Sequence, residues 1–301
     1  MKSSQEAHPS VTLFLKFLKF EKRTSAHTIT SYQTDLVQFS QYLSTTYEST
    51  PDQASHPMIR SWIISLSDQQ LDPSSVNRKI ACLRSFFRFL LREQKIDRNP
   101  MLKVRILKTA KRLPHFVRDN EMTGLLDNQT FSDDHSGWRE RLILELLYGT
   151  GMRLSELTGL KETAVNFRDE TIKVLGKRNK ERVIPFASSL GTVIKSYLKS
   201  RNKSVDKKDH GCLLVTDSGD KLYPMFVNRI VKKHLKAFSS VEKKSPHVLR
   251  HTYATHLLNK GAEINAVKDL LGHTSLAATQ VYTHNSVEKL KKVFDQAHPK
   301  A

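Results

Sequence analysis

SPHVLRHTYATHLL (Ser245–Leu258) predicts a helix that begins at Pro246, a residue suited to a first turn, and ends before Gly261, a residue suited to a C-terminal cap. His247 and Arg250 are three residues apart, so they share one face of that helix. Arginine makes bidentate contacts with phosphate oxygens, and a helix N-terminus favours an anion. Because such a pair is common on protein surfaces, the neighbouring motifs decide its meaning.

Three further residues suit phosphate chemistry, two shortly after this helix in the sequence and one far upstream of it. LGH (Leu271–His273) contains a glycine that permits a tight turn and leaves His273 accessible. VYTH (Val281–His284) contains Tyr282, and TGMRLSEL (Thr150–Leu157) contributes Arg153. A tyrosine is a poor nucleophile at neutral pH and needs cationic neighbours or a base to react. Two arginines, two histidines and a tyrosine therefore suit chemistry on a phosphodiester without a metal or other cofactor.

Charge points to the same class of substrate. The chain has 301 residues, enough for two domains, and a net charge of +19. This excess favours a nucleic acid partner over a basic surface without a partner. Cys82 and Cys212 lie far apart and form neither a zinc motif nor a disulfide framework. VTLFLKFLKF (Val11–Phe20) is too short to span a bilayer, so we expect a cytoplasmic protein with no membrane partner.

The apolar periodicity predicts a helical domain over residues 1–105, with helices at about 11–20, 28–43, 57–66 and 73–92. The last of these carries Arg84, Arg88 and Arg92 at intervals of four, a stripe that could contact a DNA backbone or be an ordinary solvated face. Residues 106–113 read ILKTAKRL and form an expected basic linker. Its cationic residues are candidate DNA contacts: Lys108, Lys111 and Arg112.

Residues 114–301 predict a second domain, mainly helical with a small β-hairpin. Thr171–Leu175 and Glu181–Phe186 are β-prone and flank GKRNK (Gly176–Lys180), which would form the hairpin tip. Helices are expected at about 138–148, 188–203, 225–238, 246–259, 263–271, 275–283 and 286–298. Two basic domains with a basic joint between them would suit a clamp around a DNA duplex.

Five motifs, in order, resemble those of the tyrosine recombinase (phage integrase) family: TGMRLSEL, GKRNKER, SPHVLRHTYATHLL, LLGH and ATQVYTH. The likeness covers all of 114–301, and the helices of 1–105 resemble the family's core-binding domain. The ending VFDQAHPKA (Val293–Ala301) is similar to that of chromosomal Xer recombinases. The resemblance implies a helical core-binding domain followed by a mixed catalytic domain.

The resemblance also implies roles for the matching residues. Tyr282 would attack the scissile phosphate and form a 3′-phosphotyrosyl bond. Arg153 and Arg250 would hold the non-bridging oxygens and stabilise the charge of the transition state. Lys177 would protonate the leaving 5′-oxygen as general acid. His247 would assist proton transfer at the tyrosine.

Two more positions match the family's supporting residues. His273 would hydrogen-bond the phosphate, and Glu156, on the same helical face as Arg153, would orient site residues. The hairpin departs from the family's usual GKGxK, because Arg178 stands where that pattern has glycine. Lys177 is therefore the first choice for the general acid and Lys180 the alternative, while Arg178 and Lys180 are also candidate DNA contacts.

The last helix, at about 286–298, has an apolar stripe that must be buried, either on its own domain or on a neighbouring protomer. In the resembling family this helix links four subunits on two DNA sites. The resemblance predicts a site-specific recombinase that works through a Holliday junction, with itself or a sister recombinase as partner and a DNA translocase as a possible activator. Chromosome dimer resolution is the expected task.

Three alternatives remain open. The first is the integrase of a mobile element, which the short segment before Val11 disfavours because it leaves no room for an arm-binding domain. The second is a DNA-binding protein without catalysis, which the full set of catalytic positions disfavours. The third is a type IB topoisomerase, which shares the chemistry and would not need paired sites.

Overall fold

The computed structural model describes residues 8–109, 115–128, 131–176, 181–206, 208, 210–272, 291 and 293–298. The chain divides into two compact units, Met1–Arg112 and Leu113–Ala301, which we call the N-terminal and C-terminal units. Within the described residues, no helix has the length and apolar character needed to cross a bilayer. The linker predicted over 106–113 lies at the junction of the units, and its residues 110–113 are outside the described part.

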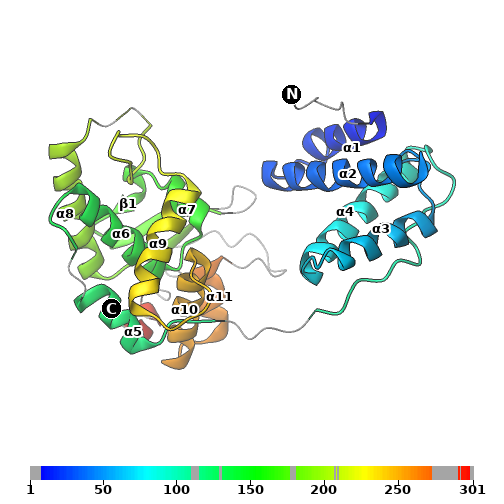
Figure 1. The fold of residues 1–301 in the computed structure, drawn as a ribbon. Coiled ribbons are helices and arrows are strands. Elements are labelled where there is room, and N and C mark those ends of the chain that lie inside the picture. Colours follow the sequence, from blue (N-terminus) through cyan, green and yellow to red (C-terminus); the bar gives the residue numbers. More distant parts are fainter. Residues whose placement is uncertain are drawn as a thin grey trace. The chain divides into compact units, whose positions relative to one another are not determined.

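The N-terminal unit is a bundle of helices in which α4 contacts each of the others (Figure 1). The described helices are α1 (Pro9–Phe20), α2 (Ala26–Tyr47), α3 (His56–Asp68) and α4 (Pro73–Arg92). Asp72 caps α4 by accepting a hydrogen bond from the amide of Ser74 at 2.9 Å, as expected for a helix that starts with Asp-Pro-Ser. The helices predicted from apolar periodicity are confirmed. α4 agrees with its predicted bounds, whereas α1, α2 and α3 are longer than predicted by two, six and three residues.

The core of this unit is rich in aromatic rings. Phe14 of α1, Phe39 of α2, and Phe86 and Phe87 of α4 are all fully buried. Leu91 is not part of the buried stripe of α4 as predicted, because 40% of it is exposed. Successive helical residues are rotated by about 100°, so Leu90 and Phe86 fill the inward face and Leu91 turns toward solvent.

The C-terminal unit is built around α6 (His135–Thr150), which is buried on almost every side and contacts α7, α8, α9 and α10. Seven successive residues of α6, Leu142–Tyr148, are buried, so this stretch is covered by protein on every side. The sequence predicted only residues 138–148 of α6. The structure adds a first turn that begins at His135. Asp134 caps this turn by accepting a hydrogen bond from the amide of Gly137 at 2.7 Å, and the apolar pattern does not extend that far.

The predicted β-hairpin is confirmed. β2 (Thr171–Leu175) pairs antiparallel with β3 (Glu181–Pro185), and β1 (Val165–Asn166) adds a short strand at the other edge of β2. Ile172 and Ile184 are register partners and are both buried, so the core fixes the register. The expected hairpin tip, residues 177–180, lies outside the described residues.

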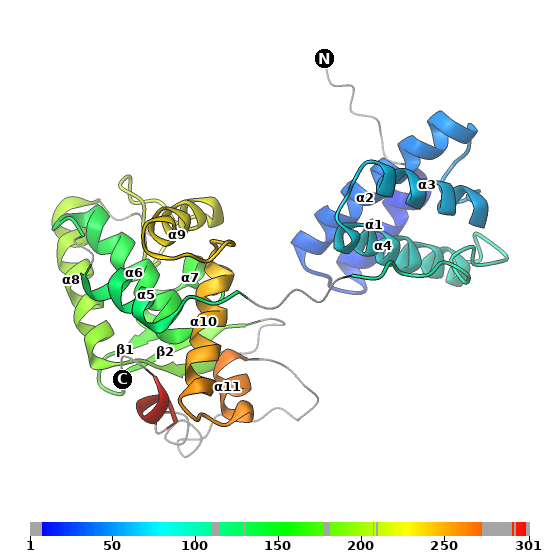
Figure 2. The same ribbon diagram turned by 60° about the horizontal axis from the view of Figure 1, so that its bottom comes forward.

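The remaining helices pack around this centre, and α11 contacts β3 while α10 contacts α6 (Figure 2). They are α5 (Asp119–Thr123), α7 (Leu154–Gly159), α8 (Ser188–Ser204), α9 (Pro224–Phe238), α10 (Pro246–Asn259) and α11 (Ile264–Leu271), with short turns of other helix types at Gly124–Asn128 and Glu162–Ala164. The prediction for α10 is confirmed at both ends. α5 was missed because one turn is too short to show a period.

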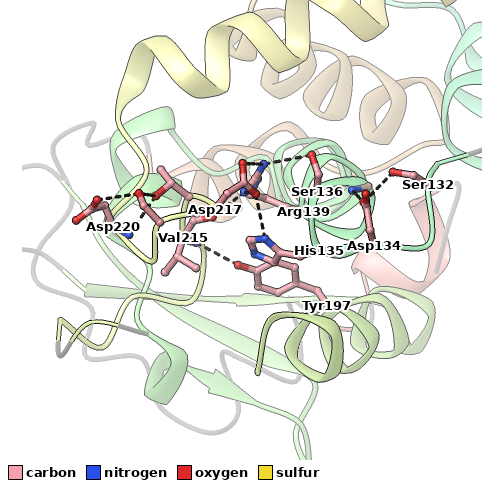
Figure 3. A network of polar contacts seen from close by, with 12 residues as sticks. Ser132, Asp134, His135, Ser136, Arg139, Tyr197, Val215, Asp217 and Asp220 are labelled. Atoms are coloured by element: carbon pink, nitrogen blue, oxygen red, sulfur yellow. Dashed lines mark hydrogen bonds and ion pairs between the residues drawn. The ribbon is translucent and has the colours of Figure 1, made fainter. Parts of the chain in front are cut away.

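A polar network holds the loop before α9 onto the helical centre (Figure 3). Asp217 of the loop accepts a hydrogen bond from the buried guanidinium of Arg139 at 2.7 Å, and His135 lies 3.3 Å away from the same carboxylate. Tyr197 of α8 accepts a hydrogen bond from the amide of Val215 at 3.1 Å. These contacts fasten a segment that has little regular structure of its own.

The described part of the C-terminal segment is helical over 293–297 and packs on its own unit. Phe294 and Ala297 are buried in the core of the C-terminal unit, and the Phe294 ring stacks on His298 at 4.7 Å between centroids. Lys291 forms an ion pair of 2.8 Å with Glu170, just before β2. The helix predicted at 275–283 lies outside the described residues, as does most of 286–292.

Candidate active site

Arg153 stands at the junction between the end of α6 and the start of α7. Gly151 ends α6 in a left-handed conformation with φ of 60°, and a Cβ atom there would lie 2.5 Å from the Tyr253 ring. Only glycine fits this turn, for both reasons. The turn brings Arg153 to the N-cap of α7 in an extended conformation, so it precedes the helix and does not share a helical face with Glu156 as predicted.

Glu156 holds Arg153 through the main chain and the side chain together. Its carboxylate accepts the Arg153 amide at 2.7 Å and the Arg153 guanidinium at 2.9 Å. The first contact is one half of a capping box, in which the third helical residue reaches back to the cap. The predicted orienting task of Glu156 fits these contacts and stays a proposal.

Arg182, which none of the sequence motifs singles out, is the second cationic partner of Glu156. Its two terminal nitrogens lie 2.6 and 2.8 Å from the two carboxylate oxygens, and its side chain is buried. One signal could have found it. Arg182 stands two residues before the apolar Ile184 in a strand, and residues two apart on a strand face the same side. An arginine on the buried face of a strand needs an acidic partner.

Arg250 is buried in the second turn of α10 and reaches the other elements of the site. Its guanidinium donates to the carbonyl of Gly151 and, at 2.6 Å, to the carbonyl of Leu271. It therefore ties α10 to the turn before Arg153 and to the end of α11. His247, one turn earlier on α10, is exposed, and no contact between it and Arg250 is observed in the described structure.

The C-terminus of α11 is where the arginines meet. The carbonyls of three successive residues each accept a hydrogen bond from a different arginine: Leu270 from Arg182 at 3.1 Å, Leu271 from Arg250 at 2.6 Å and Gly272 from Arg153 at 3.1 Å. A helix leaves its last carbonyls without intrahelical partners, and its C-terminus carries partial negative charge. His273 follows directly in the sequence and lies outside the described residues.

The cluster has more positive than negative charge. Burial and the nearby charges of Arg153 and Arg182 lower the pKa of Arg250 to about 10, which still leaves it protonated at neutral pH. Burial alone would raise the pKa of Glu156, but the hydrogen bonds and charge of Arg182, together with the Arg153 donors, lower it to about 2. Three cations thus surround one carboxylate, and 34% of the Arg153 side chain is exposed, an arrangement that suits contact with an anion.

The structure thus brings together Arg153, Glu156 and Arg250 from motifs about one hundred residues apart. Several expected site residues lie outside the described residues: Lys177, Arg178, Lys180, His273 and Tyr282, and the linker residues Lys111 and Arg112. Their roles remain predictions.

The predicted DNA-contacting arginines of α4 have unlike surroundings. Arg88 is exposed, whereas Arg84 donates to the Val104 carbonyl at 2.6 Å. Arg92 lies over the Phe17 ring at 4.2 Å and pairs with an acidic neighbour, Glu93, at 2.8 Å. Lys108, beyond α4, is exposed. Arg88 and Lys108 are thus the better placed of these candidates.

Comparison with known proteins agrees with this arrangement. Residues 115–289 match the model of the phage integrase family, and residues 11–94 match its N-terminal SAM-like domain. The chain belongs to the phage integrase family. It is a tyrosine recombinase of the Xer type, an enzyme that cleaves and rejoins DNA, and DNA is its binding partner.

Similar proteins include several named tyrosine recombinase XerC. One from Pelobacter propionicus is 38% identical, with 97% of this chain and 95% of the relative covered. One from Listeria monocytogenes is 39% identical, with 96% and 97% covered. One from Chlorobaculum tepidum is 35% identical, with 96% and 94% covered.

Solved structures show the same fold. XerH site-specific recombinase, bound to a palindromic difH substrate after cleavage, is 22% identical with a TM-score of 0.69, covering 94% of this chain and 83% of that chain. The Tn1549 transposon integrase, in complex with transposon right end DNA, is 18% identical with a TM-score of 0.71, covering 94% and 98%. The expected combination of a helical domain and a mixed, mainly helical domain with a small sheet is confirmed.

Proposed function

We propose that this tyrosine recombinase uses Tyr282 as nucleophile and the arginine cluster at the end of α11 as its phosphate site. The observation that carries the proposal is the convergence of Arg153 and Arg250 on the carbonyls that directly precede His273. Each guanidinium is fixed by main-chain oxygens, so it needs little reorganisation when a phosphate arrives. Preorganised donors of this kind stabilise the charge that develops in a transition state.

The proposed cleavage step is an exchange of two phosphorus–oxygen bonds. The phenol oxygen of Tyr282 bonds to phosphorus at the 3′ side while the bond to the 5′-oxygen breaks. His247 assists removal of the phenol proton, and Lys177 or Lys180 gives a proton to the leaving 5′-oxygen. His273 hydrogen-bonds the phosphate. Rejoining reverses these steps with the 5′-hydroxyl of another strand, so the phosphotyrosyl bond conserves the energy and no ATP is consumed.

The different exposure of Arg153 and Arg250 supports different roles for the two side chains. Arg153 keeps a third of its side chain accessible, whereas Arg250 is 5% exposed. Arginine has five N–H donors, and each of these two uses only part of that set on the protein. Arg153 would meet the phosphate first, and Arg250 would stabilise it from the buried side.

The proposed cellular task is resolution of chromosome dimers in the cytoplasm at cell division. Relatives named XerC, at 35% to 39% identity over nearly the whole chain, support this proposal. Four protomers would act on two sites, with this chain pairing with itself or with a sister recombinase, and a DNA translocase would be a candidate activator. The second candidate is the integrase of a mobile element, which the similarity in fold to the Tn1549 transposon integrase supports.

A covalent trap tests the catalytic proposal. The recombination site is first selected by binding the purified protein to a pool of random-sequence duplexes, and the selected duplex is then nicked near the expected cleavage position. Wild type should form a protein–DNA adduct that resists denaturation, and Tyr282→Phe should not. An adduct of normal yield with Tyr282→Phe would show that another residue is the nucleophile. Relaxation of supercoiled DNA lacking the selected site would instead indicate a topoisomerase.

A further inference from the structure

Arg182 of β3 is joined to two parts of the active site at once. Its two terminal nitrogens bind both oxygens of Glu156, at 2.6 and 2.8 Å, and its Nε atom donates to the Leu270 carbonyl at 3.1 Å. The side chain is 4% exposed. Because all three nitrogens of the guanidinium are engaged and the group is buried, Arg182 does not itself reach a DNA phosphate.

Through Glu156, Arg182 controls the position of Arg153. The Glu156 carboxylate is shared: each of its oxygens accepts one bond from Arg182 and one from Arg153. A bidentate arginine–carboxylate pair is planar, so Arg182 fixes the rotation of the carboxylate. Any change in that rotation shifts the two acceptors that hold the main chain and the side chain of Arg153.

Through Leu270, Arg182 also fixes the end of α11. Gly272, the cap of that helix, has φ of 63°, and a Cβ atom there would lie 2.9 Å from Cδ of Arg182. The helix end and the arginine therefore pack in direct contact. Arg182 is also the second residue of β3, the strand that follows the hairpin tip with Lys177 and Lys180 in the sequence.

We infer that Arg182 is a positioning residue for strand cleavage, which sets the distance between Arg153 and the segment leading to His273. The inference rests on the proposed function, since it assumes that Arg153 binds the scissile phosphate. Lysine cannot replace Arg182, because a single ammonium cannot make two parallel bonds to a carboxylate and a third to a carbonyl in one plane.

The test separates DNA binding from the chemical step. Arg182→Met and Arg182→Lys are compared with wild type on the nicked, selected duplex, measuring single-turnover adduct formation at saturating protein and the Kd separately. A misplacement near 1 Å can slow a reaction about 100-fold, so we expect adduct formation about 100-fold slower for Arg182→Met. The Kd should stay within about three-fold, because Arg182 does not contact DNA. Arg182→Lys should remain slowed by at least about ten-fold.

Arg201→Met is the matched control for the loss of a buried arginine. Arg201 is 1% exposed and, like Arg182, binds a carboxylate, that of Glu162 at 3.0 Å, and a main-chain carbonyl, that of Leu213 at 2.9 Å. It takes no part in the arginine cluster. Folded Arg201→Met should lose thermal stability but form the adduct at the wild-type rate.

A double variant shows whether Arg182 acts through Arg153. In Arg153→Ala, adding Arg182→Met should slow adduct formation further by less than about ten-fold, because Arg153 is already gone and only the contact of Arg182 with the end of α11 remains to be lost. If the rate losses of Arg153→Ala and Arg182→Met multiply fully in the double variant, the inference is overturned. If Arg182→Met does not fold, Arg182→Lys decides the question in the same double variant.

The inference and the proposed function fail in different ways. If wild type forms no adduct, or Tyr282→Phe still does, the proposed function is wrong. If wild type forms the adduct and both Arg182 variants match its rate, only the positioning role is refuted. An equal loss of rate in Arg201→Met would also refute it, since it would show a general effect of destabilisation.

Discussion

The guanidinium of Arg250 lies 2.6 Å from the carbonyl oxygen of Leu271, joining the second turn of α10 to the last turn of α11. Arg153 and Arg182 bind the carbonyls of the residues on either side, Gly272 and Leu270. Three cations that would repel one another are thus held together by the negative end of a single helix. The three arginines are thus assembled around the C-terminus of α11.

Removal of Arg250 should affect stability and catalysis together. Arg250→Ala should lower the free energy of unfolding by about 1–3 kcal/mol for each carbonyl left without a partner, those of Gly151 and Leu271. It should also slow adduct formation about 100- to 1000-fold, the usual cost of one transition-state donor. Urea unfolding and single-turnover cleavage measure the two effects. Cleavage at the wild-type rate would exclude Arg250 from the site.

Glu156 should make stability depend on pH in the acid range. Its pKa is lowered to about 2 in the folded protein, so its contribution is fully present above the unfolded value near 4.5 and is lost as pH falls toward 2. The shift corresponds to roughly 3 kcal/mol. The stability gap between wild type and Glu156→Gln should therefore be largest above pH 5 and shrink below it, as measured by calorimetry. A gap independent of pH would contradict this.

Local sequence patterns predict many of the helices and strands, but they do not predict which residues far apart in the sequence contact one another. The helix over 246–259 and the strands around GKRNK were predictable because caps, glycines and β-branched residues act within a few positions. The contacts of Arg182 were not predictable in this way. Glu156, its acidic partner, is 26 residues away in the sequence, and Leu270, whose carbonyl it binds, is 88 residues away. Its register with Ile184 indicates burial, but one sequence does not say which carboxylate it meets.

The capping of α7 is a second feature that the sequence alone does not predict. Arg153 and Glu156 are three residues apart, which predicts neighbours on a helix but equally suits a capping box. The choice depends on Gly151, whose left-handed turn ends α6 and lets α7 start three residues later, at Leu154. The contact of that glycine with Tyr253 decides the turn, and it is made across more than one hundred residues of sequence.

Two glycines allow backbone strain to be separated from crowding of Arg182. Gly272 and Gly261 both have positive φ, at 63° and 88°, and both lie at helix C-termini. A methyl group on Gly272 would lie 2.9 Å from Arg182, whereas one on Gly261 would meet nothing within 4 Å. Both alanine variants should lose about 1 kcal/mol of stability from strain. Only Gly272→Ala should also slow adduct formation, and equal cleavage rates in the two variants would refute this.

Exposed cations of the N-terminal unit should contribute to DNA affinity in a salt-dependent way. Arg88→Ala should weaken binding to the selected duplex and reduce the slope of log K against log salt by about 1, the effect of one lost phosphate contact. Arg92→Ala is the comparison, because its guanidinium already lies over Phe17 and beside Glu93. Arg92→Ala should lower the free energy of unfolding and have little effect on the slope of log K against log salt. Unchanged binding with Arg88→Ala would remove α4 from the DNA interface.

Phe294 tests where the C-terminal helix packs in solution. It is 1% exposed in the core of its own unit, so Phe294→Ala should lower the free energy of unfolding by about 3–5 kcal/mol. Gln296→Ala is the control, because that side chain lies in the same helical turn and is exposed. The loss should be the same at low and high protein concentration, since the contact lies within one chain. A loss that appears only at high concentration would instead place Phe294 on a neighbouring protomer, because a contact between chains depends on their association.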